Sequence, residues 1–156
     1  MQKVLLPVPH VRQRKDADCL AACAAMCLAY IGVNINYTRL LKLLKVMPYG
    51  TPGHNLKYLA SKHIQVSYRE GNLDELKTLL EDNLPCITLV RTSDLPHWHY
   101  TTDHAIVAIG FDEDAVYVND PAFEAHPLKV PLAKFELAWL AFDYRFGVLL
   151  ADSKKR

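Results

Sequence analysis

Cys19 opens a long segment without charged residues, and its position makes it the first candidate for chemistry in this sequence. The segment runs from Cys19 to Ile31 and is rich in alanine and leucine, which favour a helix. A cysteine in the first turn of a helix lies near the positive end of the helix dipole, which stabilises a thiolate. Such a thiolate can attack a carbonyl carbon if a neighbouring base handles the proton.

A histidine that could serve as this base stands at the start of an apolar strand far along the chain. His104 precedes the apolar run to Ile109, and Asp120 closes the next apolar run after the turn-forming residues 110–114. In an antiparallel hairpin, the start of one strand lies beside the end of the next. We therefore expect His104 and Asp120 to be neighbours, as a carboxylate that orients a histidine must be.

Acyl transfer also needs hydrogen-bond donors for the negative charge that develops on the carbonyl oxygen. The backbone N–H of Cys19 is one candidate donor if a helix begins there. The side-chain amide of Gln13, in the polar loop before Cys19, is the best placed second candidate. Together with His104 and Asp120, these residues predict a thiol-dependent acyl-transfer site.

The order of these residues resembles a known family, the bacteriocin-leader-processing (double-glycine) peptidases and their free-standing relatives. The resemblance rests on these motifs: Gln13 with the arm from Val8, Asp18-Cys19, the helix end Tyr30-Ile31-Gly32, His104, and Asn119-Asp120-Pro121. It implies a papain-like cysteine peptidase fold and a peptide or protein substrate, with no cofactor. It also implies that Cys19 is the nucleophile, His104 the base, Asp120 the orienting group and Gln13 a part of the oxyanion hole.

Leu20 departs from the pattern of this family, which usually has glycine immediately after the nucleophile. A leucine there could narrow the cleft, change the substrate or mark a chain that binds peptides without cleaving them. Three functions therefore stay open. They are a cysteine peptidase, an inactive peptidase-like module that binds a leader peptide or partner protein, and a thiol acyltransferase that uses the same catalytic atoms.

The loop over residues 95–102 precedes the strand of His104 and is rich in histidine and aromatic residues. Trp98 and Tyr100 are predicted either to contact substrate or to cover the core from the surface. His97 and His99 suggest a metal site, but zinc sites prefer paired cysteine or histidine ligands at short loop spacings. The cysteines of this chain lie on a helix, so we predict no metal.

The elements that must position these residues follow from local patterns. We expect an extended arm over 4–9, helices over 19–31, 37–44, 55–62 and 132–140, and strands over 64–68, 86–90, 104–109, 115–118 and 142–150. Asp18 or Asp16 is the expected N-cap of the first helix, and Gly32 its end. Asn36 caps the second, and Asn72 with Glu75 begins a further helix that ends near Asp82.

Helices come first and strands second, which predicts an α+β fold with a helical half packed on an antiparallel sheet. The chain has 156 residues, of which 51% are hydrophobic, and this suits one domain over residues 1–156 with a core of about 4–150.

The net charge of +1 gives no reason to expect nucleic acid as a partner. No stretch resembles a secretory signal or a membrane span, so we expect a cytoplasmic protein.

The cysteines support the same picture. Cys19, Cys23 and Cys27 recur at a spacing of four, so on a helix they share one stripe and run too nearly parallel for disulfides. We expect reduced thiols, with Cys23 and Cys27 as small core residues. The oligomeric state stays open.

Overall fold

A single antiparallel sheet forms the frame of the molecule. The structure is a computed structural model and describes residues 3–152, so the predicted domain ends at residues 1 and 156 lie outside the described residues. Within residues 3–152 the sheet has seven strands in the order β2-β7-β3-β4-β5-β6, with β1 beside β4. Their bounds are β1 Val4–Leu5, β2 Ile64–Glu70, β3 Cys86–Arg91, β4 Asp103–Phe111, β5 Ala115–Asn119, β6 Leu128–Pro131 and β7 Arg145–Ala151.

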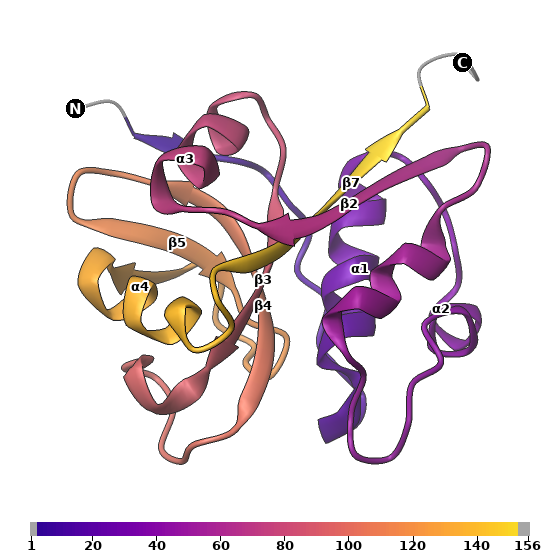
Figure 1. The fold of residues 1–156 in the computed structure, drawn as a ribbon, viewed down its shortest axis with the longest axis horizontal. Helices are drawn as coiled ribbons and strands as arrows, with labels where there is room; N and C mark the ends of the chain where they lie inside the picture. Colours follow the sequence, from indigo (N-terminus) through magenta and orange to yellow (C-terminus); the bar gives the residue numbers. More distant parts are fainter. Residues whose placement is uncertain (1–2, 153–156) are drawn as a thin grey trace.

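Helices cover both faces of this sheet. The α-helices are α1 Cys19–Tyr30, α2 Tyr37–Leu43, α3 Leu73–Glu81 and α4 Leu132–Leu140. Short 3-10 helices are η1 Asp16–Asp18, η2 Gly53–Leu59 and η3 Thr92–Asp94. Figure 1 shows α1 and α2 on one side of β3 and β4, and α3 and α4 on the other. The predicted α+β fold, with a helical half packed on an antiparallel sheet, is confirmed.

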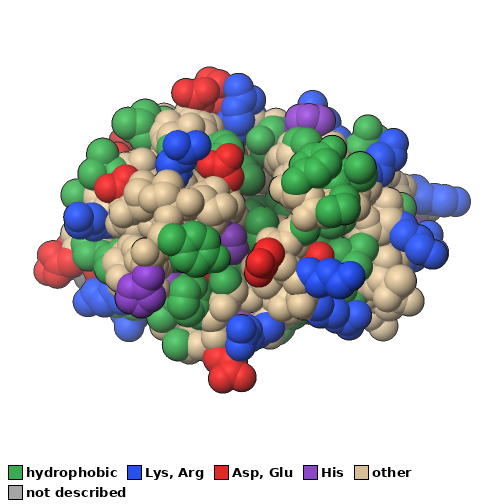
Figure 2. Space-filling view, turned by 90° about the horizontal axis from the view of Figure 1, so that it is seen from below, with side chains coloured by type: hydrophobic (Ala, Val, Ile, Leu, Met, Phe, Trp, Pro, Cys, Tyr) green, Lys and Arg blue, Asp and Glu red, His purple; other side chains and the backbone are tan. Residues whose placement is uncertain are grey.

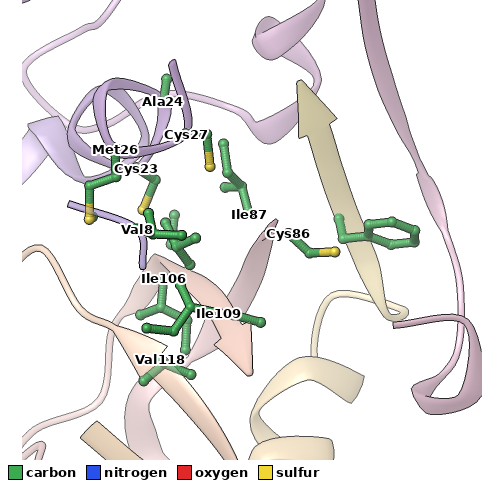
Figure 3. Packing of buried hydrophobic residues seen from close by; sticks show 14 of the residues in the cluster. Val8, Cys23, Ala24, Met26, Cys27, Cys86, Ile87, Ile106, Ile109 and Val118 are labelled. Atoms are coloured by element: carbon green, nitrogen blue, oxygen red, sulfur yellow. The ribbon is translucent and has the colours of Figure 1, made fainter. Parts of the chain in front are cut away.

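The core lies where α1 meets the sheet. Figure 3 shows Cys23, Met26 and Cys27 of α1 pointing toward the sheet residues Ile106 and Val118. All five side chains are at most 1% exposed. Full burial of a side chain as large as methionine or isoleucine contributes about 1.5–3 kcal/mol. The buried residues of α1 extend from Leu20 to Leu28, so most of the helix is anchored in the core. Cys23 and Cys27 are free thiols in the core, as predicted.

Local signals for helix ends are confirmed at three places. Gly32 follows α1 with φ of +77°, a left-handed conformation that costs glycine little. The side chain of Asn36 accepts a hydrogen bond from the backbone N–H of Arg39 at the start of α2, at 2.8 Å. The side chain of Asn72 accepts one from the backbone N–H of Glu75 at 2.9 Å, which caps α3.

Helix α1 begins at Cys19 with Asp18 at its N-cap position, as predicted, but the expected side-chain cap is absent. Helical structure already begins with η1 at Asp16, and neither Asp16 nor Asp18 caps α1 with its side chain. The buried carboxylate of Asp18 instead accepts hydrogen bonds from the backbone N–H of Lys15 at 3.2 Å and from the hydroxyl of Tyr37 at 3.1 Å. The hydrogen bond from Tyr37, on α2, thus engages the carboxylate that was expected to cap α1 and links the loop before Cys19 to the helical half.

Two other elements were predicted incorrectly. The segment expected as a helix over 55–62 is the 3-10 helix η2, in which Leu56 and Leu59 are both buried at the three-residue spacing that suits a 3-10 turn. Strand β6 was missed because it has only four residues and is bounded by Pro127 and Pro131. Prolines at strand ends are tolerated on an edge strand, and β6 is the edge beyond β5.

Candidate active site

His104 and Asp120 lie side by side, as the hairpin argument predicted. His104 is the second residue of β4, and Asp120 directly follows β5, whose pairing with β4 sets Val107 opposite Asn119. The Nε2 atom of His104 is 2.7 Å from Oδ1 of Asp120. The two side chains are 3% and 0% exposed, so solvent does not compete for this hydrogen bond.

The Asp120 carboxylate has donors on both oxygens. Oδ1 also accepts from the backbone N–H of Ala122 at 3.0 Å, and Oδ2 lies 2.8 Å from Nε2 of His97 and 2.8 Å from Nε1 of Trp98. Burial alone would raise the pKa of Asp120. The hydrogen bonds from His104 and His97 and the His104 charge outweigh burial and hold the pKa well below its usual range. Asp120 is therefore a carboxylate anion whose two oxygens both accept hydrogen bonds.

The ionised Asp120 determines which ring nitrogen of His104 must carry a proton. A carboxylate only accepts, so Nε2 of His104 must be the donor, and Nδ1 is the nitrogen left for another partner. Burial lowers the pKa of His104, but hydrogen bonds to Asp120 and Cys19 and their negative charges raise it to about 9. The imidazolium form is thus favoured at neutral pH, next to the thiol of Cys19.

Cys19 differs from the other cysteines in its access to solvent. It is partly exposed and lines a cavity of about 410 Å³ together with His104. Cys23, Cys27 and Cys86 are buried free thiols, and burial raises the pKa of Cys27 to about 12 and those of Cys23 and Cys86 well above the ordinary value. A reagent in water therefore meets one accessible cysteine in the described residues.

Gln13 lies in the loop before η1, with its side-chain amide turned toward that loop. Its Nε2 donates to the carbonyl of Lys15 at 3.2 Å and reaches the carbonyl of Asp16 at 3.5 Å, which is a weak contact. Its Oε1 is buried and has no hydrogen-bond partner. The backbone N–H of Gln13 donates to the carbonyl of Pro121, which joins this loop to the residue after Asp120.

Two cavities flank the His104 side chain. The first, of about 410 Å³, contains Cys19 and Leu20 in its lining and is bordered by the loop over 48–53. The second, of about 530 Å³, contains Trp98 and Tyr100. Figure 2 shows the hollow on this face of the molecule, with hydrophobic side chains on both sides of it. His104 belongs to the lining of both cavities, so the candidate cleft passes over it.

The residues predicted to contact substrate occupy different settings in this cleft. Leu20 is 1% exposed and packs into the core, so it offers little surface to a ligand. Tyr100 is 64% exposed at the second cavity. Trp98 is half-buried, and its indole bonds Asp120 besides lining that cavity.

His97 was considered at the sequence level only as a metal ligand, and its contact with Asp120 was missed. No periodicity or motif pairs a loop histidine with a carboxylate that lies across the molecule, so the sequence offered no signal for it.

Within residues 3–152 no group of three histidine, cysteine or acidic side chains is placed to hold a metal. In the same range, helices of the length and apolar character required to cross a bilayer are absent.

Solved structures place this fold among the C39-like peptidases. A protein described as a C39-like peptidase from Bacillus anthracis superposes with a TM-score of 0.80 at 22% identity, covering 98% of this chain and 100% of that one. A double glycine motif protease from an AMS/PCAT transporter, in complex with its leader peptide, gives 0.69 at 24% identity over 97% of each chain. The peptidase domain of Streptococcus ComA, a bifunctional ABC transporter of a quorum-sensing pathway, gives 0.71 at 18% identity over 91% and 97%.

The sequence itself assigns the family. The model of the Peptidase C39-like family matches residues 5–145, and the chain belongs to that family. A search of curated proteins finds no match. The resemblance proposed from the sequence is thus confirmed at the level of family and fold, and a peptidase function follows in general terms.

Proposed function

We propose that this chain is a cysteine peptidase in which Cys19 is the nucleophile, His104 the general acid and base, and Asp120 the group that orients His104. The observation that carries the proposal is the buried 2.7 Å contact between His104 and Asp120, which leaves Nδ1 of His104 for the accessible thiol at the start of α1. The proposed peptidase unit is one domain, with a core over residues 4–150.

The reaction needs no group beyond these side chains and water. The Cys19 thiolate attacks the carbonyl carbon of a peptide bond, and a carbon–sulfur bond forms while the carbonyl oxygen gains negative charge. The proton on Nδ1 of His104 passes to the leaving nitrogen, and the carbon–nitrogen bond breaks to leave a thioester. Water then attacks the thioester, gives a proton to His104, and the carbon–sulfur bond breaks.

Gln13 supports the negative charge on the carbonyl oxygen in this proposal. Its Nε2 has one normal and one long contact with loop carbonyls, so one N–H is only weakly engaged and can turn toward a stronger, charged acceptor. The turn that begins at Asp16 orders the backbone immediately before Cys19. Donors aimed at the developing charge are usually the largest single contribution to catalysis in acyl transfer.

A peptide in extended form is the substrate that suits the site. The cleft is open on both sides of His104, with about 410 Å³ at Cys19 and about 530 Å³ beyond, which is room for chain on each side of a scissile bond. One structure of similar fold is a double glycine motif protease in complex with its leader peptide. We accordingly propose a peptide or protein substrate and no cofactor.

Leu20 is the observation behind a second candidate, a module that binds peptides without cleaving them. Its side chain is 1% exposed and packs into the core, which weakens the idea that it obstructs the cleft. The variant Cys19→Ala separates the two functions, because it should bind a peptide as the wild type does and release no product. Incubation with a labelled acceptor amine separates hydrolysis from acyl transfer by the product that forms.

Alkylation by iodoacetamide at neutral pH tests the proposal directly. Peptide mapping by mass spectrometry gives the rate at each cysteine in the folded protein. We expect Cys19 to react first by a wide margin, because Cys23, Cys27 and Cys86 are buried and their raised pKa values keep them as thiols. His104→Gln should slow Cys19 and leave the other rates unchanged. Equal rates at all four cysteines would rule out an activated Cys19.

A further inference from the structure

The outer oxygen of Asp120 has two donors that the proposed chemistry does not require. Oδ2 lies 2.8 Å from Nε2 of His97 and 2.8 Å from Nε1 of Trp98, while Oδ1 serves His104 and the backbone of Ala122. A carboxylate offers about four lone-pair positions, and these contacts use two on each oxygen. The Asp120 side chain is 0% exposed, so no water replaces a donor that is lost.

We infer that His97 and Trp98 are positioning residues, which hold the plane of the Asp120 carboxylate so that Oδ1 stays directed at His104. The inference rests on the proposed peptidase function and concerns two residues that act through Asp120 and do not touch the scissile bond. A carboxylate with partners on one oxygen only can rotate about its side-chain torsion, a broad and soft coordinate. Donors on the second oxygen remove that freedom.

The two residues are held in place independently of Asp120. The loop that carries them is closed by Thr92, whose hydroxyl donates to the carbonyl of Tyr100 at 2.7 Å and accepts from the backbone N–H of Thr102 at 2.8 Å. Leu95 anchors the same loop in the core at 2% exposure. Loss of the donors at His97 and Trp98 should therefore leave the loop folded, which allows their role to be tested.

Trp98 also contacts the other member of the pair. Its ring lies 4.8 Å from the His104 ring, centroid to centroid, at an interplanar angle of 63°, and 5.3 Å from that of Phe123. The indole thus limits the movement of the imidazole while its N–H holds the carboxylate. His97 packs edge-on against Phe123 at 5.0 Å, so both donors share one aromatic support.

The ionic state of Asp120 agrees with this role. The hydrogen bond from His97 is among the contributions that hold the pKa of Asp120 below its usual range against the cost of burial. The carboxylate accepts only, so Nε2 of His97 must carry the hydrogen. A side chain that offers an N–H at the same reach should therefore replace His97, and an apolar side chain of similar volume should not.

The test compares His97→Leu, Trp98→Phe and their combination with His97→Gln, which keeps an amide donor. The readout is the pH profile of Cys19 alkylation by iodoacetate, a probe too small to depend on the peptide cleft, whose carboxylate is attracted by the His104 imidazolium. Loss of the His104 proton removes this attraction and slows the reaction, so the alkaline limb of the profile should lie near pH 9 in the wild type. The charged and titratable groups beside His104 are Cys19 on α1 and Asp120 after β5. The cavities that His104 lines add Asp16 and Asp103 in both, Tyr49 and Tyr68 in the first, and Arg12, Arg14, Lys15, His99 and Tyr100 in the second.

We expect the double variant to react about 10- to 100-fold more slowly, with its alkaline limb at lower pH, because a freed Asp120 no longer fixes the His104 proton. His97→Gln should recover most of the rate and the position of the limb. His63→Leu, a change at an exposed histidine that lines neither cavity, should match the wild type. Thermal melting of each variant shows that it is folded.

Three results would overturn the inference. They are an alkaline limb in the folded double variant that stays where it is in the wild type, a limb that moves to higher pH, and a His97→Gln variant as impaired as His97→Leu. Failure of the proposed function is a separate outcome, since it would appear as slow Cys19 alkylation in the wild type itself.

Discussion

The two halves of the candidate site differ in how completely their polar groups are paired. On the base side, the Asp120 carboxylate is 0% exposed and has donors on both oxygens. On the oxyanion side, Oε1 of Gln13 is buried without a partner, and Nε2 makes one normal and one long contact. A buried polar atom without a hydrogen-bond partner costs about 1–3 kcal/mol of stability. The oxyanion side therefore contains an acceptor, Oε1 of Gln13, that is unpaired in the free protein.

This difference indicates when each half is needed. In the proposed mechanism His104 must hold its proton before a substrate arrives, which agrees with a carboxylate that is already fixed in the free protein. In the same mechanism the oxyanion forms only during the reaction, so the proposed donor, Gln13, can keep weak contacts until a stronger acceptor is present. Changes on the base side should therefore affect both stability and activity, whereas changes at Gln13 should affect activity alone.

Asp120→Asn should give the largest effect on both properties. It removes the charge that holds the His104 proton and sets an amide donor among groups that themselves donate. We expect the hydrolysis rate to fall roughly 10²- to 10⁴-fold, a loss of the size seen when a triad carboxylate is neutralised. Removing one partner of a buried pair costs about 3–5 kcal/mol of unfolding free energy. Peptide turnover and urea unfolding measure these two losses, and retention of both would contradict the account.

The stability difference between wild type and Asp120→Asn should also depend on pH, with a sign that follows from the shifts. The pKa of His104 is raised in the folded protein, so its contribution is complete below the unfolded value of about 6.5 and is lost as the pH rises to about 9. The pKa of Asp120 is lowered, so its contribution is present above about 3.9 and is lost as the pH falls below that. Denaturant midpoints across this range should show the difference largest near pH 5–6.

Gln13→Ala should separate activity from stability. The loss of one oxyanion donor typically slows acyl transfer by about 10²- to 10³-fold. The same change removes a buried acceptor that has no partner and also the hydrogen bond from Nε2 to the carbonyl of Lys15, and because these two effects oppose each other the unfolding free energy should change by no more than about 1 kcal/mol. Peptide turnover and urea unfolding midpoints, measured on one preparation, test this prediction. A Gln13→Ala variant as destabilised as Asp120→Asn would contradict the proposed difference between the two halves of the site.

Leu20→Gly should have the smallest effect on chemistry. Its side chain is 1% exposed on α1, so the change leaves a cavity and adds a helical glycine, and it should destabilise the fold by about 2–5 kcal/mol. If Leu20 instead narrows the cleft, glycine should raise the turnover of peptides. We expect no such rise. A marked gain in kcat/KM in the folded variant would show that this leucine restricts substrate access.

The sequence could predict those parts of the site that follow from local pattern and strand order. A run without charge gave α1, and apolar runs around residues 110–114 gave the hairpin that brings His104 beside Asp120. The first depends on local composition and the second on the order of the strands, and here tertiary packing agrees with both. Capping by Asn36 and Asn72 was predictable for the same reason.

Contacts fixed by the path of a loop could not be predicted. The donors from His97 and Trp98 reach Asp120 from a loop that Thr92 closes, and no spacing in the sequence reports that closure. Asp18 has the residue type of an N-cap, but Tyr37, on another helix, takes up its carboxylate. In both cases tertiary hydrogen bonds override a local preference or create a contact where no local preference exists.

Trapping of the covalent intermediate tests the central claim most directly. The protein is mixed with an activated acyl ester, quenched in acid within the burst of product release, and digested for mass spectrometry. We expect an acyl thioester on Cys19 alone, absent in Cys19→Ala and slower to form in Asp120→Asn. A burst without an adduct on Cys19, or an adduct that survives in Cys19→Ala, would contradict it.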